Sequence, residues 1–189
     1  MKNLIKTKSL INISKLASGN FASQFLIILF APILTRLYSP ESYGVAGLFI
    51  TLISILDVFT SLRYEFAVVL PKKDEEAIYI VWTSFLITTI TSIFSLFLII
   101  IFRERIIYLF DLRGLDKLIW FIPVSLFVTG ISKPLIKFSI RKRRFGELAV
   151  VSFSQKFLGQ IIRLILYSKN SFGLVIATTL DQLTGSIII

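Results

Sequence analysis

The stretch Ala77–Phe102, AIYIVWTSFLITTITSIFSLFLIIIF, runs for 26 residues without an Asp, Glu, Lys or Arg. An α-helix rises about 1.5 Å per residue, so a helix of this length crosses the roughly 30 Å hydrocarbon core of a bilayer with some tilt to spare. The rest of the chain is similar in character, because 55% of its 189 residues are apolar and its mean hydropathy is +0.83. We therefore expect an integral membrane protein.

Apolar segments of helical length recur along the whole chain and are joined by short connections. They cover approximately residues 11–34, 45–62, 77–102, 118–140, 148–167 and 172–189. The predicted fold class is all-α, a polytopic membrane bundle of about six transmembrane helices that forms a single unit over residues 1–189. The chain ends at Ile189 inside an apolar run, which predicts a truncated protein or a gene fragment.

Composition excludes several classes of function. The sequence contains no Cys and no His, so disulfides, thiol nucleophiles, Cys/His zinc sites and a histidine base are excluded. A net charge of +10 in a soluble protein would suggest nucleic acid. Here the charges lie mainly between apolar segments, where membrane topology explains them, so we expect no nucleic-acid partner. No catalytic residues, metal site or cofactor are predicted, and we do not expect an enzyme.

The flanking basic residues predict the orientation. Ten of them lie at the amino terminus and in the second and fourth connections between apolar segments, namely Lys2, Lys6, Lys8, Arg63, Lys72, Lys73, Arg141, Lys142, Arg143 and Arg144. Six lie in the first, third and fifth connections, namely Arg36, Arg103, Arg105, Arg113, Lys117 and Lys169. Because cytoplasmic loops carry the excess of Lys and Arg, we expect a multi-pass protein with a cytoplasmic amino terminus.

Polar residues recur at helical spacing within five of the six segments. The stripes are Asn12, Lys15, Gly19 and Ser23; Ser54, Asp57, Ser61 and Glu65; Gly130, Lys133, Lys137 and Arg141; Ser152, Lys156, Gly159, Gln160 and Arg163; and Thr178, Asp181, Gln182 and Gly185. A charge at the bilayer centre costs roughly 2.5–3.5 kcal/mol, so such stripes turn toward a protein interior or a water-filled cavity. We expect five helices around one polar centre, with segment 77–102 at the periphery.

The predicted centre is basic. Its charges are Lys15, Lys133, Lys137, Lys156 and Arg163 against Asp57 and Asp181, a net of +3. A basic cavity suits an anionic group such as a phosphate. The candidate substrate-binding residues are Lys15, Arg63, Lys133, Lys156, Gln160 and Arg163, and the ion-pair or coupling candidates are Asp57 and Asp181.

Structural roles remain as alternatives for these residues. Lys15, Lys137 and Arg163 lie near segment ends, where long side chains reach to the interface. Asp181 could form an ion pair with Lys156 that has no substrate role, and Asp57 could pair with Lys15. Arg63 and Glu65 could pair with each other or across bundles. Arg36 is interpreted as an interfacial anchor in preference to a gate residue at the outer mouth. Small and hydroxylated residues also allow membrane helices to pack closely.

Two motifs carry a family resemblance. The stretch 32–44, PILTRLYSPESYG, resembles the end of the first helix and the first loop of polysaccharide flippases. Within this stretch, Pro40 and Gly44 are expected to mark a short turn between two helices. The stretch 63–77, RYEFAVVLPKKDEEA, also resembles that family and lies at the expected separation. These flippases are the O-antigen and capsule translocases of the multidrug/oligosaccharidyl-lipid/polysaccharide exporter superfamily.

The resemblance implies two six-helix bundles that face each other across a central cavity. It implies a location in the bacterial cytoplasmic (inner) membrane and translocation of an undecaprenyl-pyrophosphate-linked oligosaccharide across it, as in lipopolysaccharide synthesis. This chain would supply the amino-terminal half, and its partners would be the lipid-linked oligosaccharide, membrane lipids, a second six-helix half and the polysaccharide polymerase machinery. The alternatives are a multidrug exporter of the same superfamily, a membrane-embedded glycan polymerase or ligase, and a non-functional truncated remnant.

Overall fold

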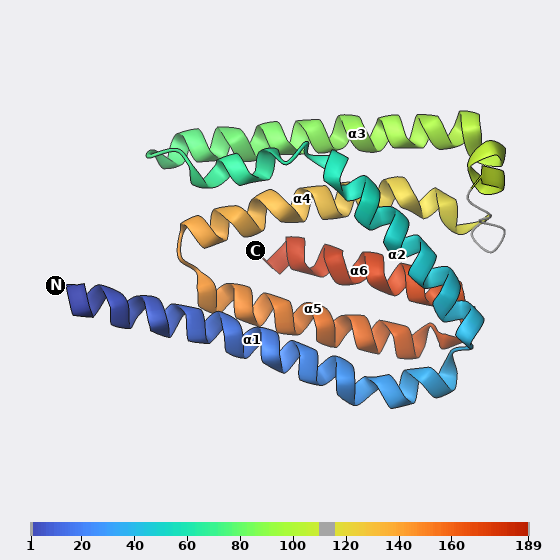
Figure 1. Cartoon of the computed structure of the whole chain (residues 1–189), viewed down its shortest axis with the longest axis horizontal. Helices are drawn as coiled ribbons and strands as arrows, with labels where there is room; N and C mark the ends of the chain where they lie inside the picture. The colour runs from blue at the N-terminus through green and yellow to red at the C-terminus, as the bar shows by residue number, and fades with distance from the viewer. Residues whose placement is uncertain (1, 110–115, 189) are drawn as a thin grey trace.

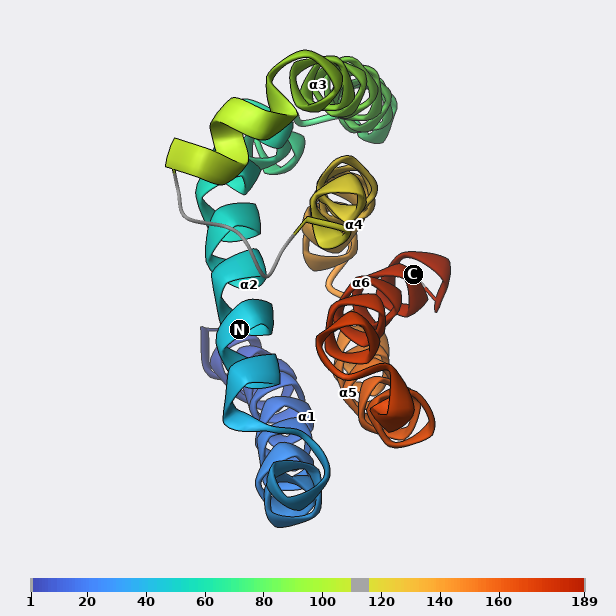
Figure 2. The ribbon, with the colours of Figure 1, turned by 90° about the vertical axis from the view of Figure 1, so that its right-hand side faces the viewer.

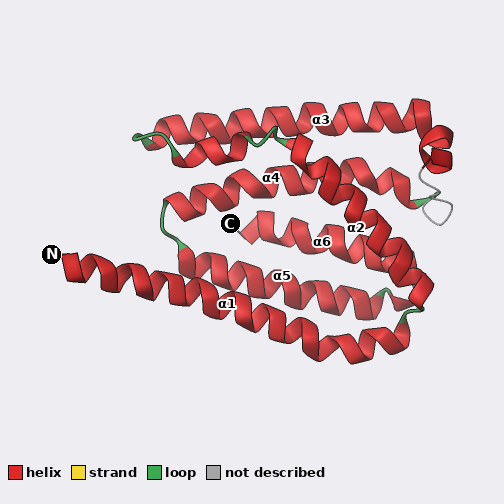
Figure 3. Cartoon of the chain, in the orientation of Figure 1, coloured by secondary structure: helices red, strands yellow, loops and turns green. Residues whose placement is uncertain are grey.

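In the described part of the chain there are six long α-helices and three short 3₁₀ helices, and Figures 1 and 3 show how they are arranged. The computed structural model describes the backbone of residues 2–109 and 116–188 and, within these, the side chains of Ser14 and of residues 17–108 and 116–184. The elements are α1 (Lys2–Leu37), α2 (Pro40–Thr60), η1 (Tyr64–Val69), α3 (Asp74–Leu109), η3 (Leu118–Trp120), α4 (Phe121–Arg141), α5 (Phe145–Ile165), η4 (Tyr167–Lys169) and α6 (Ser171–Ile188). Each expected apolar segment lies on one long helix.

Five of these helices are long and apolar enough to cross a membrane. The spans are Ala17–Leu37, Pro40–Thr60, Asp74–Tyr108, Leu118–Arg141 and Phe145–Ile165. The protein is therefore an all-α, multi-pass membrane bundle. Helix α6 is not one of the five, although it packs against α5, α4 and α2 in the middle of the bundle. Five of the six expected membrane-crossing segments are thus found as spans in the described part of the chain, and the sixth lies on α6.

The turn before α2 shows how local sequence sets a helix boundary. Ser39 is the N-cap of α2, and its hydroxyl accepts a hydrogen bond of 3.2 Å from the amide of Ser42. Pro40 begins the helix, where its missing amide hydrogen costs nothing. The prediction that Pro40 marks the turn is confirmed. The same prediction for Gly44 is wrong, because Gly44 lies within α2.

The helices are not packed in chain order. Helix α1 packs most extensively against α5, and α5 packs against α6. Helix α4 lies between α6 and α3, while α2 crosses obliquely over α4 and α6 (Figure 1). Figure 2 shows α1 and α2 along one side of the molecule and α4, α6 and α5 along the other. Helix α3 lies at the edge, as expected, with large apolar side chains such as Trp82, Phe94 and Phe97 exposed.

The main apolar core forms where α2, α4 and α6 meet. Phe49 and Ile53 of α2 are buried there with Leu126 of α4 and Val175 of α6, and Ile119 of η3 closes one end. A smaller core joins Val68 of η1 to Ala77 and Val81 of α3. These two cores fix α2, α4 and α6 relative to one another and hold η1 against α3.

Small residues bring two helix pairs close together. A Cβ on Gly19 of α1 would lie 2.5 Å from the Cβ of Ala149 on α5, and a Cβ on Gly130 of α4 would lie 2.3 Å from Cγ2 of Thr88 on α3. Close approach through small residues is a common way to associate helices in lipid. Gly19 and Ser23 of the α1 stripe thus lie on a packing face, since Ser23 is buried and donates to the Gly19 carbonyl.

One end of the bundle gathers the predicted basic flanks. The amino terminus, the η1–α3 loop and the α4–α5 turn lie at the same end in Figure 1. There Arg141 donates to the carbonyls of Val69 and Pro71 at 3.4 and 2.5 Å and to Asp74 Oδ1 at 3.1 Å. Two connections that the sequence assigns to one side of the membrane are therefore held side by side.

Candidate functional site

The centre of the candidate site is a buried carboxylate on α6 that faces two cations on α5. Asp181 is 4% exposed, and its Oδ2 lies 3.0 Å from Lys156 Nζ and 3.9 Å from Arg163 Nη2. Gly159 lies between the two cations on α5 and permits this approach, because a Cβ there would lie 3.0 Å from Asp181 Cγ. The predicted polar face of α5 is confirmed, since its charged residues converge on one point.

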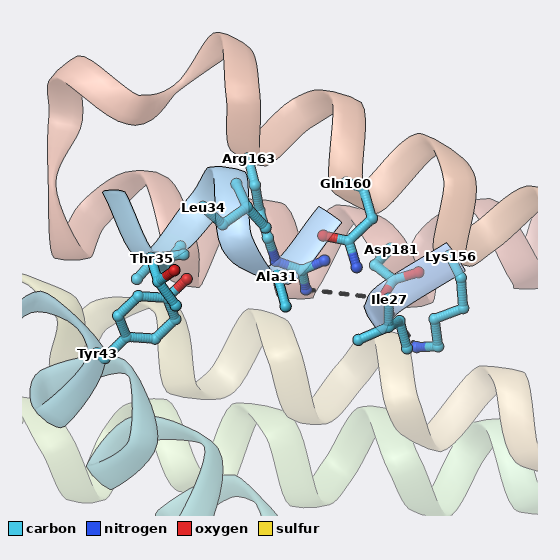
Figure 4. A pocket seen from close by; sticks show the side chains of 10 residues that line it. Ile27, Ala31, Leu34, Thr35, Tyr43, Lys156, Gln160, Arg163 and Asp181 are labelled. Atoms are coloured by element: carbon cyan, nitrogen blue, oxygen red, sulfur yellow. Dashed lines mark hydrogen bonds and ion pairs between the residues drawn. The ribbon is translucent and has the colours of Figure 1, made fainter. Parts of the chain in front are cut away.

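Two hollows meet at this cluster. The larger has a volume of about 310 Å³ and is lined by Ile27, Ala31, Leu34, Thr35, Tyr43, Lys156, Gln160, Arg163, Leu174 and Asp181 (Figure 4). The smaller has a volume of about 180 Å³ and is lined by Phe49, Ile50, Ile53, Ser54, Ser125, Lys156, Arg163, Thr178, Thr179, Asp181 and Gln182. Lys156, Arg163 and Asp181 line both, so the ionic cluster lies between a hollow against α1 and a hollow against α2.

The first sequence motif contributes directly to this site. Tyr38 is 3% exposed, and its hydroxyl donates to the carbonyl of Arg163 at 2.6 Å. Burial raises the pKa of Tyr38 above its usual value. Tyr38 also packs edge-on against Tyr43, with ring centroids 6.0 Å apart, and Tyr43 lines the larger hollow. Sequence reasoning missed both tyrosines; their position next to a helix-start signal was the only clue.

A second ionic cluster lies where α2, η1 and α4 meet. Lys133 Nζ is 2.5 Å from Asp57 Oδ2 and 4.0 Å from Glu65 Oε1, and it donates to the Asp57 carbonyl at 3.2 Å. Glu65 is 2% exposed and accepts a hydrogen bond from Ser61. The second motif therefore supplies a buried carboxylate for Lys133. Neither Lys133 nor Asp57 lines the two hollows described above.

The remaining candidates lie elsewhere. Arg63 is exposed, with its guanidinium 5.8 Å from the centre of the Phe66 ring, and it lines neither hollow. Its expected partner Glu65 faces Lys133 and Ser61 instead. Lys15 lies on α1, but its side chain is outside the described residues, so its pairing with Asp57 stays a prediction. Among the described side chains, Asp57 pairs with Lys133.

The expected single basic centre is corrected to two clusters of different charge. Lys156 and Arg163 share one carboxylate, whereas Lys133 faces two. The stripe on α1 packs against α5 rather than supplying charge to the hollows in the described part of the chain. Periodicity showed which faces are polar, but the partner of each face depends on how the helices are rotated and arranged in space.

Among the described side chains, no group of three His, Cys, Asp or Glu residues could hold a metal ion. The arrangement is instead that of a membrane helix bundle with an ion-paired, partly hollow interior. The family model for polysaccharide biosynthesis proteins matches residues 33–189 of the chain. The chain belongs to this family. A search of curated proteins and a search of solved structures each found no match.

Proposed function

We propose that the protein takes part in moving an undecaprenyl-pyrophosphate-linked oligosaccharide across the bacterial cytoplasmic membrane during synthesis of surface polysaccharide such as O-antigen. Membership of the polysaccharide biosynthesis family supports the pathway, and five membrane-spanning helices support a role within the bilayer. A flippase fits both, since lipid-linked sugars made on one face of a membrane must cross it. On this proposal the protein is a transporter rather than an enzyme.

The observation that carries the proposal is the sharing of Asp181 by Lys156 and Arg163. One carboxylate facing two cations leaves an excess of positive charge beside the hollows. Attraction between such a cation and an anion is stronger in a low-dielectric interior than in water. Diphosphate oxygens accept the same charge-assisted hydrogen bonds as a carboxylate, so a diphosphate could take the place of Asp181 without leaving the cations unpaired. A cationic drug would meet repulsion here.

The cluster is also accessible. The Lys156 side chain is 39% exposed although its partner Asp181 is buried, so the helices of this chain do not enclose it completely. We propose that a second helix bundle faces this side and completes the cavity, and that the present bundle acts as one half of a transport unit. Under this arrangement the bundle alone would not transport.

The test is made in cells of the native host. Deleting the gene should abolish surface polysaccharide and leave the lipid-linked oligosaccharide on the cytoplasmic leaflet, protected from glycosidases added outside the inner membrane. Loss of a polymerase would instead expose single repeats on the outer leaflet. Unchanged surface polysaccharide in the deletion strain would refute the proposal, and an altered drug resistance with normal polysaccharide would favour a multidrug exporter.

Site variants sharpen this test. The triple variant Lys156→Met, Arg163→Met and Asp181→Asn removes both cations without leaving a lone buried carboxylate. We expect it to insert at normal abundance and to restore less than about a tenth of surface polysaccharide, because the anion loses both charge-assisted contacts. Lys169→Met, which removes an exposed cation from η4, is the matched control and should restore it fully.

A further inference from the structure

Two hydrogen-bond acceptors at the larger hollow have no partner among the described residues. Oε1 of Gln160 and Oδ1 of Asp181 are both buried, in side chains of residues that are 3% and 4% exposed. Both residues line the hollow of about 310 Å³. A buried polar atom without a partner is costly, and the few that native proteins retain call for an explanation such as a ligand.

These atoms require a chemistry that a phosphate does not supply. A diphosphate at neutral pH presents oxygens that accept hydrogen bonds, and these suit the ammonium of Lys156 and the guanidinium of Arg163. An amide oxygen and a carboxylate oxygen need a donor. Figure 4 shows the amide of Gln160 between Arg163 and Lys156, directed to the same side of α5. The hollow thus has positions for an anion and, immediately beside them, positions for a group with hydroxyl or N–H donors.

The spacing restricts which part of a ligand can reach both positions. Gln160 is one helical turn from Lys156 and one turn from Arg163, so their Cβ atoms lie about 5–6 Å apart along α5. In a polyprenyl diphosphate sugar, the first sugar is bonded to the diphosphate through its anomeric oxygen. The substituent on the neighbouring carbon, position 2, is the donor closest to the phosphates.

We infer that Gln160 and Asp181 bind the sugar attached directly to the diphosphate, with the hydroxyl or amide N–H at its position 2 donating to Oε1 of Gln160 and a further hydroxyl of the same sugar donating to Oδ1 of Asp181. This inference rests on the proposed function and adds a selectivity to it. The cations hold the part of the ligand common to all such lipids, and the acceptors recognise the first sugar. Sugars further along the oligosaccharide lie beyond this contact.

The experiment uses the full 189-residue chain in lipid nanodiscs and three short-chain ligands. These are a polyprenyl diphosphate, its glucosyl derivative and its 2-deoxyglucosyl derivative, with dissociation constants measured by microscale thermophoresis. One hydrogen bond corresponds to a change of roughly two- to tenfold in affinity. We expect the glucosyl ligand to bind tighter than the 2-deoxyglucosyl ligand by about this factor, and the polyprenyl diphosphate tests whether the anion site binds by itself.

Variants assign the preference to the acceptor. Gln160→Met keeps the length of the side chain and removes the amide, so it should bind the glucosyl and 2-deoxyglucosyl ligands with equal affinity. Gln24→Met, at an exposed glutamine on α1, is the matched control and should retain the preference. The ligand series on the unmodified chain needs no variant, so the inference stays testable even if Gln160→Met folds poorly.

The outcomes separate the inference from the proposed function. If none of the ligands binds, the anion site itself fails and the inference falls with it. If the glucosyl and 2-deoxyglucosyl ligands bind the unmodified chain equally, the anion site stands and the contact at position 2 is refuted. If the glucosyl ligand is preferred and Gln160→Met keeps that preference, the contact exists elsewhere and the assignment to Gln160 is wrong.

Discussion

At the scale of single residues, Asp181 and its two cations are not equivalent. Removing Lys156 leaves Asp181 facing Arg163, so the buried carboxylate keeps a counter-ion. Removing the charge of Asp181 leaves two cations at the same place without one. Breaking a buried ion pair so that one charge is left alone costs about 3–5 kcal/mol, whereas an exposed pair contributes about 1 kcal/mol or less.

We therefore predict that Asp181→Asn lowers the melting temperature of the detergent-solubilised protein much more than Lys156→Met does. The expected loss is about 3 kcal/mol for the first and below about 1 kcal/mol for the second, whose side chain is 39% exposed. Asp116→Asn, at an exposed aspartate, is the control for loss of a negative charge. Equal effects of Asp181→Asn and Lys156→Met would mean that Arg163 does not share the carboxylate.

Residue roles were predicted from the sequence only in part. The depth of Lys133, Lys156 and Asp181 in their segments indicated correctly that they lie within the bundle, and the alternative pairing of Lys156 with Asp181 is present. The pairing of Lys133 with Asp57 was not predicted, because it depends on α2 crossing α4 at that level. Tyr38 was missed because its partner is a backbone carbonyl, which no side-chain pattern reveals.

At the scale of helices, the contact of α1 with α5 depends on the absence of a side chain at Gly19. The Cα and carbonyl oxygen of Ala149 lie 2.7 and 3.1 Å from the position that a Cβ on Gly19 would take. Backbone atoms cannot move aside as a flexible side chain can. Any residue larger than glycine must therefore push the two helices apart.

We predict that Gly19→Ala destabilises the protein by about 1–3 kcal/mol, the usual cost of overpacking, measured as a lower melting temperature. Gly47→Ala on α2 is the control, because nothing lies within 4 Å of its new Cβ and alanine favours a helix by about 1 kcal/mol. Adding Ala149→Gly to Gly19→Ala should recover part of the loss. A neutral Gly19→Ala would show that α1 is loosely held.

The helices themselves were the most predictable feature. Long apolar segments and short connections located all six, and the stripe on α5 gave the correct inward face. The stripe on α1 was interpreted as cavity lining, although Gly19 and Ser23 lie on a packing face. Small and hydroxylated residues serve both purposes in a membrane helix, so spacing alone does not separate them.

At the scale of the whole molecule, the clustering of connections supports a definite topology. Arg141 ties the α4–α5 turn to the η1–α3 loop, so these two connections share one face of the membrane. The sequence places ten basic flanking residues at this end and six at the other. Because the richer side is cytoplasmic in most membrane proteins, we propose that this end, with the amino terminus, faces the cytoplasm.

Reporter fusions test this orientation. We predict cytoplasmic activity for fusions after Pro71 and after Arg144, and activity on the opposite side for a fusion after Asp111. Pairing a reporter active only in the cytoplasm with one active only outside it provides the control at each site. The reversed pattern would overturn the orientation, while opposite results at Pro71 and Arg144 would contradict the fold itself.

The packing of α1 against α5 also determines the order of events during synthesis. Helix α1 ends at Leu37, but its main neighbour is complete only when the ribosome has passed Ile165. At about 5–20 residues per second, the first helix spends on the order of ten seconds in the bilayer before that neighbour exists. During this interval its glycine-containing face has only lipid or the insertion machinery beside it. Biogenesis of this protein therefore includes an interval in which α1 has been made but its main packing partner, α5, has not.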